Sequence, residues 1–326
     1  MHGMVVRWGI LATGGIAAKF TEDLALLPGA EAVAVGSRTA AAAQAFAQRY
    51  GIPRAHGSWA ELAADPEVDV VYLATPHSAH VAAALECIEA GKAVLVEKPM
   101  ALDVPAAKDL VTAARSRGTF LMEAMWMRCL PGIRRLVELV DAGAIGEVTT
   151  VQADFGLAGP FPPEHRLRDP ALGGGALLDL GIYPVSLAHL LLGNPVRLTA
   201  TASLTPEGVD QNTAVILDYP NAMAVLHCGM VGATPGTASV TGTDGRIDLP
   251  PGFHRPQWLT VHRRGAAEPD VIEAPIDGWG YHIEAGEVGR CLSEGLLESP
   301  LVPLDTTLEV LAILDALRVQ IGVEYP

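Results

Sequence analysis

A glycine-rich turn stands where an apolar run of the chain gives way to a helical pattern. The turn is Ala12-Thr13-Gly14-Gly15-Ile16, between the apolar run 5–11 and a helical stretch over 15–27. Glycine here lets the backbone approach a bound phosphate, and a helix amino terminus offers unpaired N–H groups and a positive dipole end to its charge. The turn therefore predicts a pyrophosphate site, although Ala12 stands where the G-x-G-x-x-G/A pattern expects its first glycine. The alternative is a plain loop.

A second apolar run, 32–36, ends in Ser37 and Arg38. Enzymes that prefer NAD usually place Asp or Glu at this distance from the turn, roughly 20 residues on, where it binds the ribose hydroxyls. A carboxylate would repel a 2′-phosphate, whereas Ser37 can hydrogen-bond it and Arg38 can pair with it by charge. The sequence thus favours NADP(H) and leaves NAD(H) open. The alternative is that Arg38 is an ordinary solvated residue at a helix start.

Lys98 directly follows the apolar run 93–96 and Glu97, and it precedes a proline. The carboxyl ends of parallel strands meet at the edge where open α/β sheets bind ligands. Lys98 is therefore expected at the site, held there by the sharp turn at Pro99. The alternative is a surface lysine that extends from the edge of the sheet.

The segment Thr75-Pro76-His77 and the nearby His80 follow the apolar run 70–74, at the same predicted edge. Two histidines three residues apart suggest metal ligands, but no third His, Cys or carboxylate stands at a suitable spacing. We therefore predict no metal. The segment is expected beside the cofactor and substrate, or simply at the start of a helix.

The elements that must position these residues alternate regularly over roughly the first 120 residues, as in a parallel sheet covered on both faces. Strands are expected at 5–11, 32–36, 70–74, 93–96 and 119–122, and helices at 15–27, 39–50, 78–90 and 103–117. Ser58 and Glu61 form a capping-box signal for one more short helix. We predict a Rossmann-type doubly wound sheet.

The pattern changes after Pro131 to strands punctuated by turns. Helices are expected at 133–142, 176–192, 281–297 and 305–321, and strands at 147–156, 196–205, 212–218, 222–230, 236–241, 246–249 and 257–262. This predicts an α+β domain with a large, mostly antiparallel open sheet. The expected domains are 1–123 for NAD(P) binding and 124–326 for substrate binding and dimerisation, with the last helix able to pack back on the first.

Composition limits the classes of partner. The net charge of −15, without a basic patch, argues against nucleic acid, and no run of about 18 apolar residues suggests a membrane span. The four cysteines are far apart in the sequence, which predicts reduced, mostly buried thiols. The first residues lack the pattern of a leader sequence, so a cytoplasmic location is expected.

Four segments, in this order along the chain, resemble the Gfo/Idh/MocA family of oxidoreductases. They are GILATGGIA, ATPHSAH, AGKAVLVEKPMALD and GGGALLDLGIYPVSLAHLLLG, and the Glu-Lys-Pro run is the most specific of them. The branch of dihydrodiol dehydrogenases and NADP-dependent D-xylose dehydrogenases is most similar, because it shares Met122-Glu123-Ala124-Met125-Trp126 and a Gly-Ile-Tyr after the aspartate. The resemblance also implies a cis Lys98-Pro99 bond.

The resemblance implies that Lys98 is catalytic, that Tyr183 donates or accepts a proton, and that Asp179 orients the substrate. Asp179 and Tyr183 are four residues apart, so they share one face of a helix. Hydride leaves a carbinol carbon only as its hydroxyl proton is taken, and an ammonium group stabilises an ionised phenol. The alternative for Tyr183 is a core tyrosine.

The resemblance also places Trp126, Arg128 and Phe155 in the substrate pocket, where a sugar ring or flat diol would lie against Trp126. We therefore predict an NADP(H)-dependent oxidoreductase acting on a hydroxyl-bearing carbon of a sugar, polyol or dihydrodiol. The family pairs through its open sheet, which implies a homodimer. Two alternatives remain: an NAD(P)-dependent glycoside hydrolase that uses transient oxidation, and a non-catalytic NADP-responsive regulator.

Overall fold

The computed structural model describes residues 5–326 and forms two compact units. The first is the chain up to Cys129 with Asp277–Leu308, and the second is Leu130–Ile276 with Glu309–Pro326. Segment 277–308 was expected in the second domain, yet it packs in the first because the buried carboxylate of Asp23 accepts hydrogen bonds from the backbone N–H groups of Trp279 and Tyr281. Residues 1–4, on which the expected lack of a leader partly rests, lie outside the described residues.

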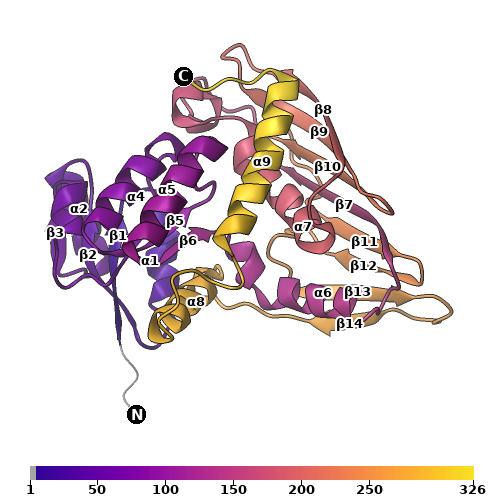
Figure 1. Cartoon of the computed structure of the whole chain (residues 1–326), viewed down its shortest axis with the longest axis horizontal. Coiled ribbons are helices and arrows are strands. Elements are labelled where there is room, and N and C mark those ends of the chain that lie inside the picture. The colour runs from indigo at the N-terminus through magenta and orange to yellow at the C-terminus, as the bar shows by residue number, and fades with distance from the viewer. Residues whose placement is uncertain (1–4) are drawn as a thin grey trace. The chain divides into compact units, whose positions relative to one another are not determined.

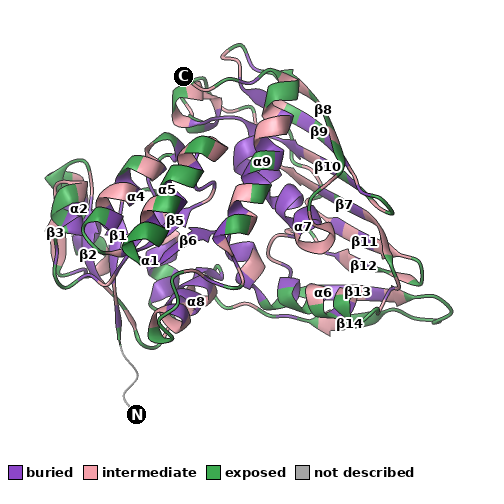
Figure 2. Ribbon diagram, viewed as in Figure 1, coloured by how far each residue is buried: buried purple, intermediate pink, exposed green. Residues whose placement is uncertain are grey.

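The first unit is built on a parallel sheet of six strands in the order β3-β2-β1-β4-β5-β6 (Figure 1). The strands are β1 (Val6–Leu11), β2 (Ala30–Gly36), β3 (Arg54–His56), β4 (Val70–Leu73), β5 (Ala93–Glu97) and β6 (Leu121–Ala124). Strands β4 to β6 are buried throughout, as their apolar sequences require (Figure 2). The predicted Rossmann-type parallel sheet is confirmed. Strand β3 was missed because its three residues form no apolar run.

Helices flank this sheet, and those that begin at Ala40, Trp59 and Val104 are capped by a side chain. They are α1 (Gly15–Leu24), α2 (Ala40–Tyr50), α3 (Trp59–Ala63), α4 (His80–Glu89), α5 (Val104–Arg117) and α8 (Tyr281–Ser293). Ser58 accepts a hydrogen bond from the Glu61 N–H at 3.2 Å, so the predicted short helix is present. Helix α1 ends at Leu24, three residues before the predicted end, where the chain turns toward β2.

The second unit contains a sheet of eight strands in the order β14-β13-β12-β11-β7-β10-β9-β8. The strands are β7 (Val148–Gly156), β8 (Arg197–Leu204), β9 (Asp210–Asp218), β10 (Met223–Gly229), β11 (Ala238–Gly242), β12 (Gly245–Leu249), β13 (Trp258–Arg263) and β14 (Asp270–Glu273). Neighbouring strands are antiparallel except β7 and β10. The predicted sheet is confirmed. The edge strand β14 was missed because it is mostly exposed and lacks a buried apolar run.

The remaining helices are α6 (Pro131–Asp141), α7 (Ile182–Leu192) and α9 (Leu304–Ile321). A π-helical turn, Leu177–Gly181, runs into α7, where a single α-helix was expected. Segment Pro170–Leu192 has the length and a mean hydropathy (1.5) sufficient for a membrane-spanning helix, but 83% of its most apolar window is buried inside the protein. With so much of its apolar surface packed against the rest of the chain, this segment has the burial of a core helix.

Candidate active site

The glycine-rich turn between β1 and α1 has the backbone conformation of a ligand-binding loop. Within residues 5–326, Ala12 is the non-glycine residue with a left-handed backbone, at φ +107°. It occupies the place where the sequence pattern expects glycine, and such a backbone costs an alanine about 1–3 kcal/mol. Gly14 and Gly15 are exposed, with open space where a side chain would be. The backbone at Ala12 is thus strained. Gly14 and Gly15 leave open space at the amino terminus of α1, where an anion has room to bind.

Two other groups at this sheet edge fit a dinucleotide. The Thr75 hydroxyl is buried after β4, with no hydrogen-bond partner among the described residues. Burying a hydroxyl without a partner is costly, so a bound ligand would complete its hydrogen bonding. Ser37 and Arg38 directly follow β2, and the Arg38 side chain is exposed. The residues present therefore fit the expected cofactor.

Lys98 lies in a turn that directly follows β5. Three buried side chains contact the backbone of this turn. Glu97 accepts a hydrogen bond from the Lys98 N–H at 3.2 Å, and Glu123 accepts one from the Met100 N–H at 2.9 Å. The Nδ1 atom of His80 lies 2.8 Å from the Pro99 carbonyl oxygen. The Lys98-Pro99 bond is cis, as the family resemblance implied. Side chains of β5, β6 and α4 thus hold the backbone at positions 98, 100 and 99 respectively.

His80 is the first residue of α4, as one of the two expectations had it. Its ring is fully buried, and Nε2 lies 2.9 Å from the Thr75 carbonyl oxygen while Nδ1 faces that of Pro99. Burial lowers the pKa of His80 to about 3, so the ring is neutral and donates its single N–H to one carbonyl at a time. His80 therefore links the ends of β4 and β5. His77 is buried as well.

Glu97 also points into the first unit, where the Tyr72 hydroxyl donates a hydrogen bond to it. Sequence reasoning missed its neighbour Glu284 on α8. Glu284 is fully buried, and neither of its carboxyl oxygens has a hydrogen-bond partner in the described part of the chain. Burial, followed by the charge of Glu97, raises the pKa of Glu284 well above its usual range and thus favours the neutral carboxyl group.

Trp126 and Arg128 also belong to the first unit. The Trp126 ring is 5% exposed and packs on Tyr281, with 4.8 Å between ring centroids, so little of it faces outward. Arg128 is half-buried near Glu123. Burial raises the pKa of Glu123, while its hydrogen bonds and then the charges of Arg128 and Lys98 oppose that shift. The positive charges of Arg128 and Lys98 therefore both favour the ionised form of the Glu123 carboxyl group.

The second unit holds Asp179 and Tyr183 together on the π-helical turn and α7. Both are buried, and Asp179 Oδ2 lies 3.0 Å from Nη2 of Arg166. The Tyr183 ring lies among aromatic rings, 5.5 Å from Phe155 and 5.1 Å from His254 between centroids. A π-turn at this place is typical of functional sites in helices.

Arg166 and His254 are site residues that sequence reasoning missed. The His254 ring stacks on Phe155 with 4.5 Å between centroids and 14° between planes. Arg166 begins a short 3-10 helix and His254 lies in a turn, and neither belongs to a sequence motif, so no local signal marks them. Among residues 5–326 no group of three His, Cys, Asp or Glu side chains could hold a metal ion, and the four cysteines are free and buried.

Two family models match this chain. A model described as "Oxidoreductase family, NAD-binding Rossmann fold" matches residues 6–125, and "GFO/IDH/MocA C-terminal domain" matches residues 133–248. The chain belongs to the Gfo/Idh/MocA family. It is therefore an NAD(P)-binding oxidoreductase, and its Rossmann-type unit and antiparallel sheet are those of this family.

Individual relatives and solved structures resemble the chain along nearly its whole length. The chain is 38% identical to trans-1,2-dihydrobenzene-1,2-diol dehydrogenase of Bos taurus over 334 residues and 39% identical to that of Mus musculus over 338 residues, covering 99% of each chain in both cases. It is 28% identical to the 3-ketoreductase KijD10 of Actinomadura kijaniata in complex with NADP and TDP-benzene, with a TM-score of 0.86 over 98% of this chain and 99% of that one. An aldose-aldose oxidoreductase of Caulobacter crescentus is 27% identical, with a TM-score of 0.88 over 97% of each chain.

Proposed function

We propose that this protein is an NADP(H)-dependent dehydrogenase that oxidises a hydroxyl-bearing carbon of a cyclic diol or sugar. The observation that carries the proposal is the turn at Lys98, whose backbone is held by Glu97, Glu123 and His80. A lysine immobilised in this way at the carboxyl edge of a parallel sheet lies where such sheets bind their ligands. Full-length similarity to dihydrodiol dehydrogenases supports the same reaction class.

NADP(H) is the proposed cofactor. Its pyrophosphate would lie at Gly14 and Gly15, where α1 begins without an acidic residue in its first turn. Ser37 and Arg38 would bind the 2′-phosphate by hydrogen bond and charge. When bound, the nicotinamide supplies the hydride acceptor. Replacing Arg38 with Glu is expected to weaken NADP+ binding more than NAD+ binding, because the new carboxylate repels the 2′-phosphate.

Proton transfer is assigned to Tyr183. In the proposed oxidation, the substrate's carbon–hydrogen bond breaks with its electron pair, and Tyr183 takes the hydroxyl proton as the carbonyl forms. Asp179, which lies on the same helical segment as Tyr183, accepts a hydrogen bond from a second substrate hydroxyl, and Lys98 is the catalytic lysine that the family resemblance implies. The rings of Phe155 and His254 beside Tyr183 offer flat surfaces for a substrate ring, which favours an unsaturated cyclic diol.

A homodimer is proposed from the sheet of the second unit. Along β9 and β10, buried side chains alternate with exposed apolar ones, and Ile216 and Val225, each 41% exposed, are paired across the two strands. An apolar sheet face of this kind is stable in water when another surface covers it. A cytoplasmic location is proposed from the four buried free cysteines, which suit a reducing compartment.

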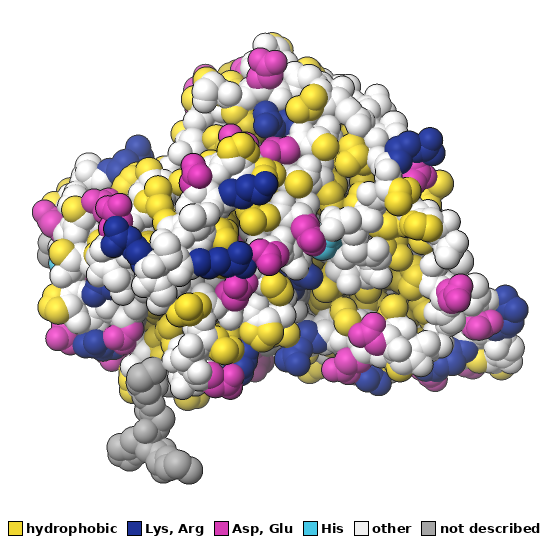
Figure 3. Space-filling view, viewed as in Figure 1, with side chains coloured by type: hydrophobic (Ala, Val, Ile, Leu, Met, Phe, Trp, Pro, Cys, Tyr) yellow, Lys and Arg dark blue, Asp and Glu magenta, His cyan; other side chains and the backbone are white. Residues whose placement is uncertain are grey.

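The net charge of the chain is negative, and this bears on the class of substrate. On the face seen in Figure 3, lysine and arginine side chains lie interspersed with acidic ones and form no continuous basic patch. With the net charge of −15, this supports a small-molecule substrate over nucleic acid.

The test is the reduction of NADP+ and NAD+ at 340 nm with trans-dihydrobenzenediol, D-xylose, other aldoses and inositols. Turnover is expected with NADP+ and a diol or aldose. Tyr183→Phe is expected to lower kcat at least about 100-fold while leaving NADP+ affinity nearly unchanged. Unaltered turnover in this variant would refute the proton-transfer role. With aryl glycosides as additional substrates, sugar release without a net change in absorbance would instead support the glycoside hydrolase.

A further inference from the structure

The helical segment that carries Asp179 and Tyr183 follows three glycines, Gly173-Gly174-Gly175, and the last two of them leave no room for side chains. A Cβ atom on Gly174 would lie 2.8 Å from the Leu167 carbonyl oxygen and 2.9 Å from that of Arg166. A Cβ atom on Gly175, whose φ is +109°, would collide with the Asp210 carboxylate. The start of this helical segment is therefore packed between other parts of the second unit.

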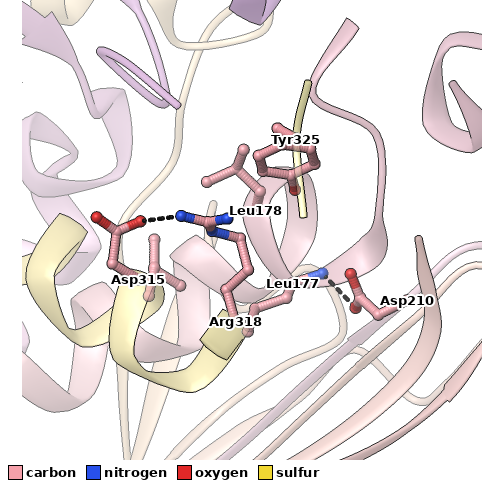
Figure 4. Close-up of a pocket in the computed structure, with 7 residues that line it drawn as sticks. Leu177, Leu178, Asp210, Asp315, Arg318 and Tyr325 are labelled. Carbon is pink, nitrogen blue, oxygen red and sulfur yellow. Dashed lines mark hydrogen bonds and ion pairs between the residues drawn. The ribbon is translucent and has the colours of Figure 1, made fainter. Parts of the chain in front are cut away.

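Asp210, the first residue of β9, holds one side of this start. Its side chain is buried, and its carboxylate accepts hydrogen bonds from the Leu177 N–H and the Thr213 hydroxyl, each at 2.7 Å (Figure 4). Burial raises the pKa of Asp210, and these hydrogen bonds oppose that shift. A carboxylate at this position satisfies a backbone N–H group of the first helical turn.

The C-terminal tail holds the other side. The Tyr325 hydroxyl donates a hydrogen bond to the Gly174 carbonyl oxygen at 2.8 Å. The Arg318 guanidinium lies 5.1 Å from the centre of the Tyr325 ring, donates to the Val323 carbonyl oxygen at 3.3 Å, and pairs with Asp315 at 3.3 Å (Figure 4). The tail is thus fixed to α9 just before it reaches the glycines.

These contacts close the space between tail and helix. The side chains around it are Leu177, Leu178, Asp210, Leu314, Asp315, Arg318 and Tyr325 (Figure 4), and the gap between them is too small for a water molecule. A ligand site would need room for a ligand. The arrangement is therefore a packed junction between the C-terminal tail and the start of the helical segment.

We propose that Tyr325 and Asp210 are positioning residues that set the place of Asp179 and Tyr183. Leu177, whose N–H donates to Asp210, lies in the same π-helical turn as Asp179, and this turn continues into the helix that carries Tyr183. A shift at Leu177 therefore displaces both side chains. The glycines before this turn also fix the segment bearing Arg166, because the Gly175 N–H donates to the Leu167 carbonyl at 2.8 Å. The consequence for catalysis rests on the proposed function, whereas the consequence for the helical segment does not.

The first test measures the segment itself by hydrogen–deuterium exchange in the full-length protein. Tyr325→Phe removes only the hydroxyl, and losing one such hydrogen bond is expected to speed exchange in peptides covering 173–183 about fivefold. Tyr50→Phe is the matched control, because it removes the hydrogen bond from Tyr50 to Glu22 in the first unit and should leave exchange at 173–183 unchanged. Unchanged exchange at 173–183 in Tyr325→Phe would overturn the inference.

The second test measures turnover. If the helical segment positions the proton-transfer residue, Tyr325→Phe and Asp210→Asn lower kcat severalfold, shift the pH profile of kcat and leave the KM for NADP+ unchanged. Equal losses in kcat and NADP+ affinity would indicate general destabilisation and count against a positioning role. If the wild-type enzyme oxidises no diol or sugar, the proposed function fails, while the exchange measurement still decides the inference.

Discussion

The Asp179 carboxylate is paired with Arg166, with 3.0 Å between Oδ2 and Nη2, although the two side chains differ strongly in exposure. That of Asp179 is 6% exposed and that of Arg166 is 52% exposed. The exposed guanidinium therefore neutralises a buried carboxylate and also reaches outward. A substrate hydroxyl that binds Asp179 must do so beside this positive charge.

Replacing Arg166 with Gln should raise the KM for the diol or sugar about tenfold, because Asp179 loses the partner that orients it. Arg166→Lys keeps the charge and should recover part of the loss. Steady-state kinetics with NADP+ saturating give both values. A KM in Arg166→Gln equal to that of the wild type would show that the ion pair does not orient Asp179 for substrate.

The buried ring of His80 makes stability depend on pH. Folding lowers its pKa from 6.5 to about 3. Between these values the unfolded chain binds a proton that the folded protein does not, so acid favours unfolding by up to about 1.4 kcal/mol per pH unit. His80→Gln cannot be protonated and should lose less stability between pH 6.5 and 5. Urea unfolding of both proteins at several pH values provides the comparison, and parallel pH dependences would contradict it.

The left-handed backbone at Ala12 predicts opposite effects of two substitutions. Ala12→Gly should raise the unfolding temperature by about 2 °C, because relief of strain exceeds the extra backbone entropy of glycine. Ala12→Val should be destabilised by more than about 1 kcal/mol, since a β-branched side chain tolerates a positive φ poorly. Thermal melts check both, and equal melting of the valine variant and the wild type would argue against strain.

The paired residues Ile216 and Val225 test the proposed dimer. Changing both to Lys places two charges on the exposed apolar sheet face and is expected to give a monomer in sedimentation velocity. Val319→Lys is the matched control, because Val319 is 74% exposed on α9. A double variant that sediments with the wild type would place the contact between copies elsewhere.

The sequence alone determined the elements whose signals are local. Continuous apolar runs predicted β1, β2, β4 and β5, because a strand buried on both faces must be apolar along its length. Ser58 and Glu61 predicted the start of α3, because capping involves residues three apart. The Glu-Lys-Pro run indicated the family because its residues are consecutive in the chain.

Only the tertiary structure decided which side chains meet across long separations. Arg166 pairs with Asp179 from a short 3-10 helix, and His254 stacks on Phe155 from the connection between β12 and β13. The ring of His80 is buried between the backbone carbonyls of Thr75 and Pro99, although its place after a predicted strand suggested a residue beside the cofactor. Such contacts depend on the tertiary fold of the chain. Local patterns such as hydrophobic periodicity and helix capping contain no information about them.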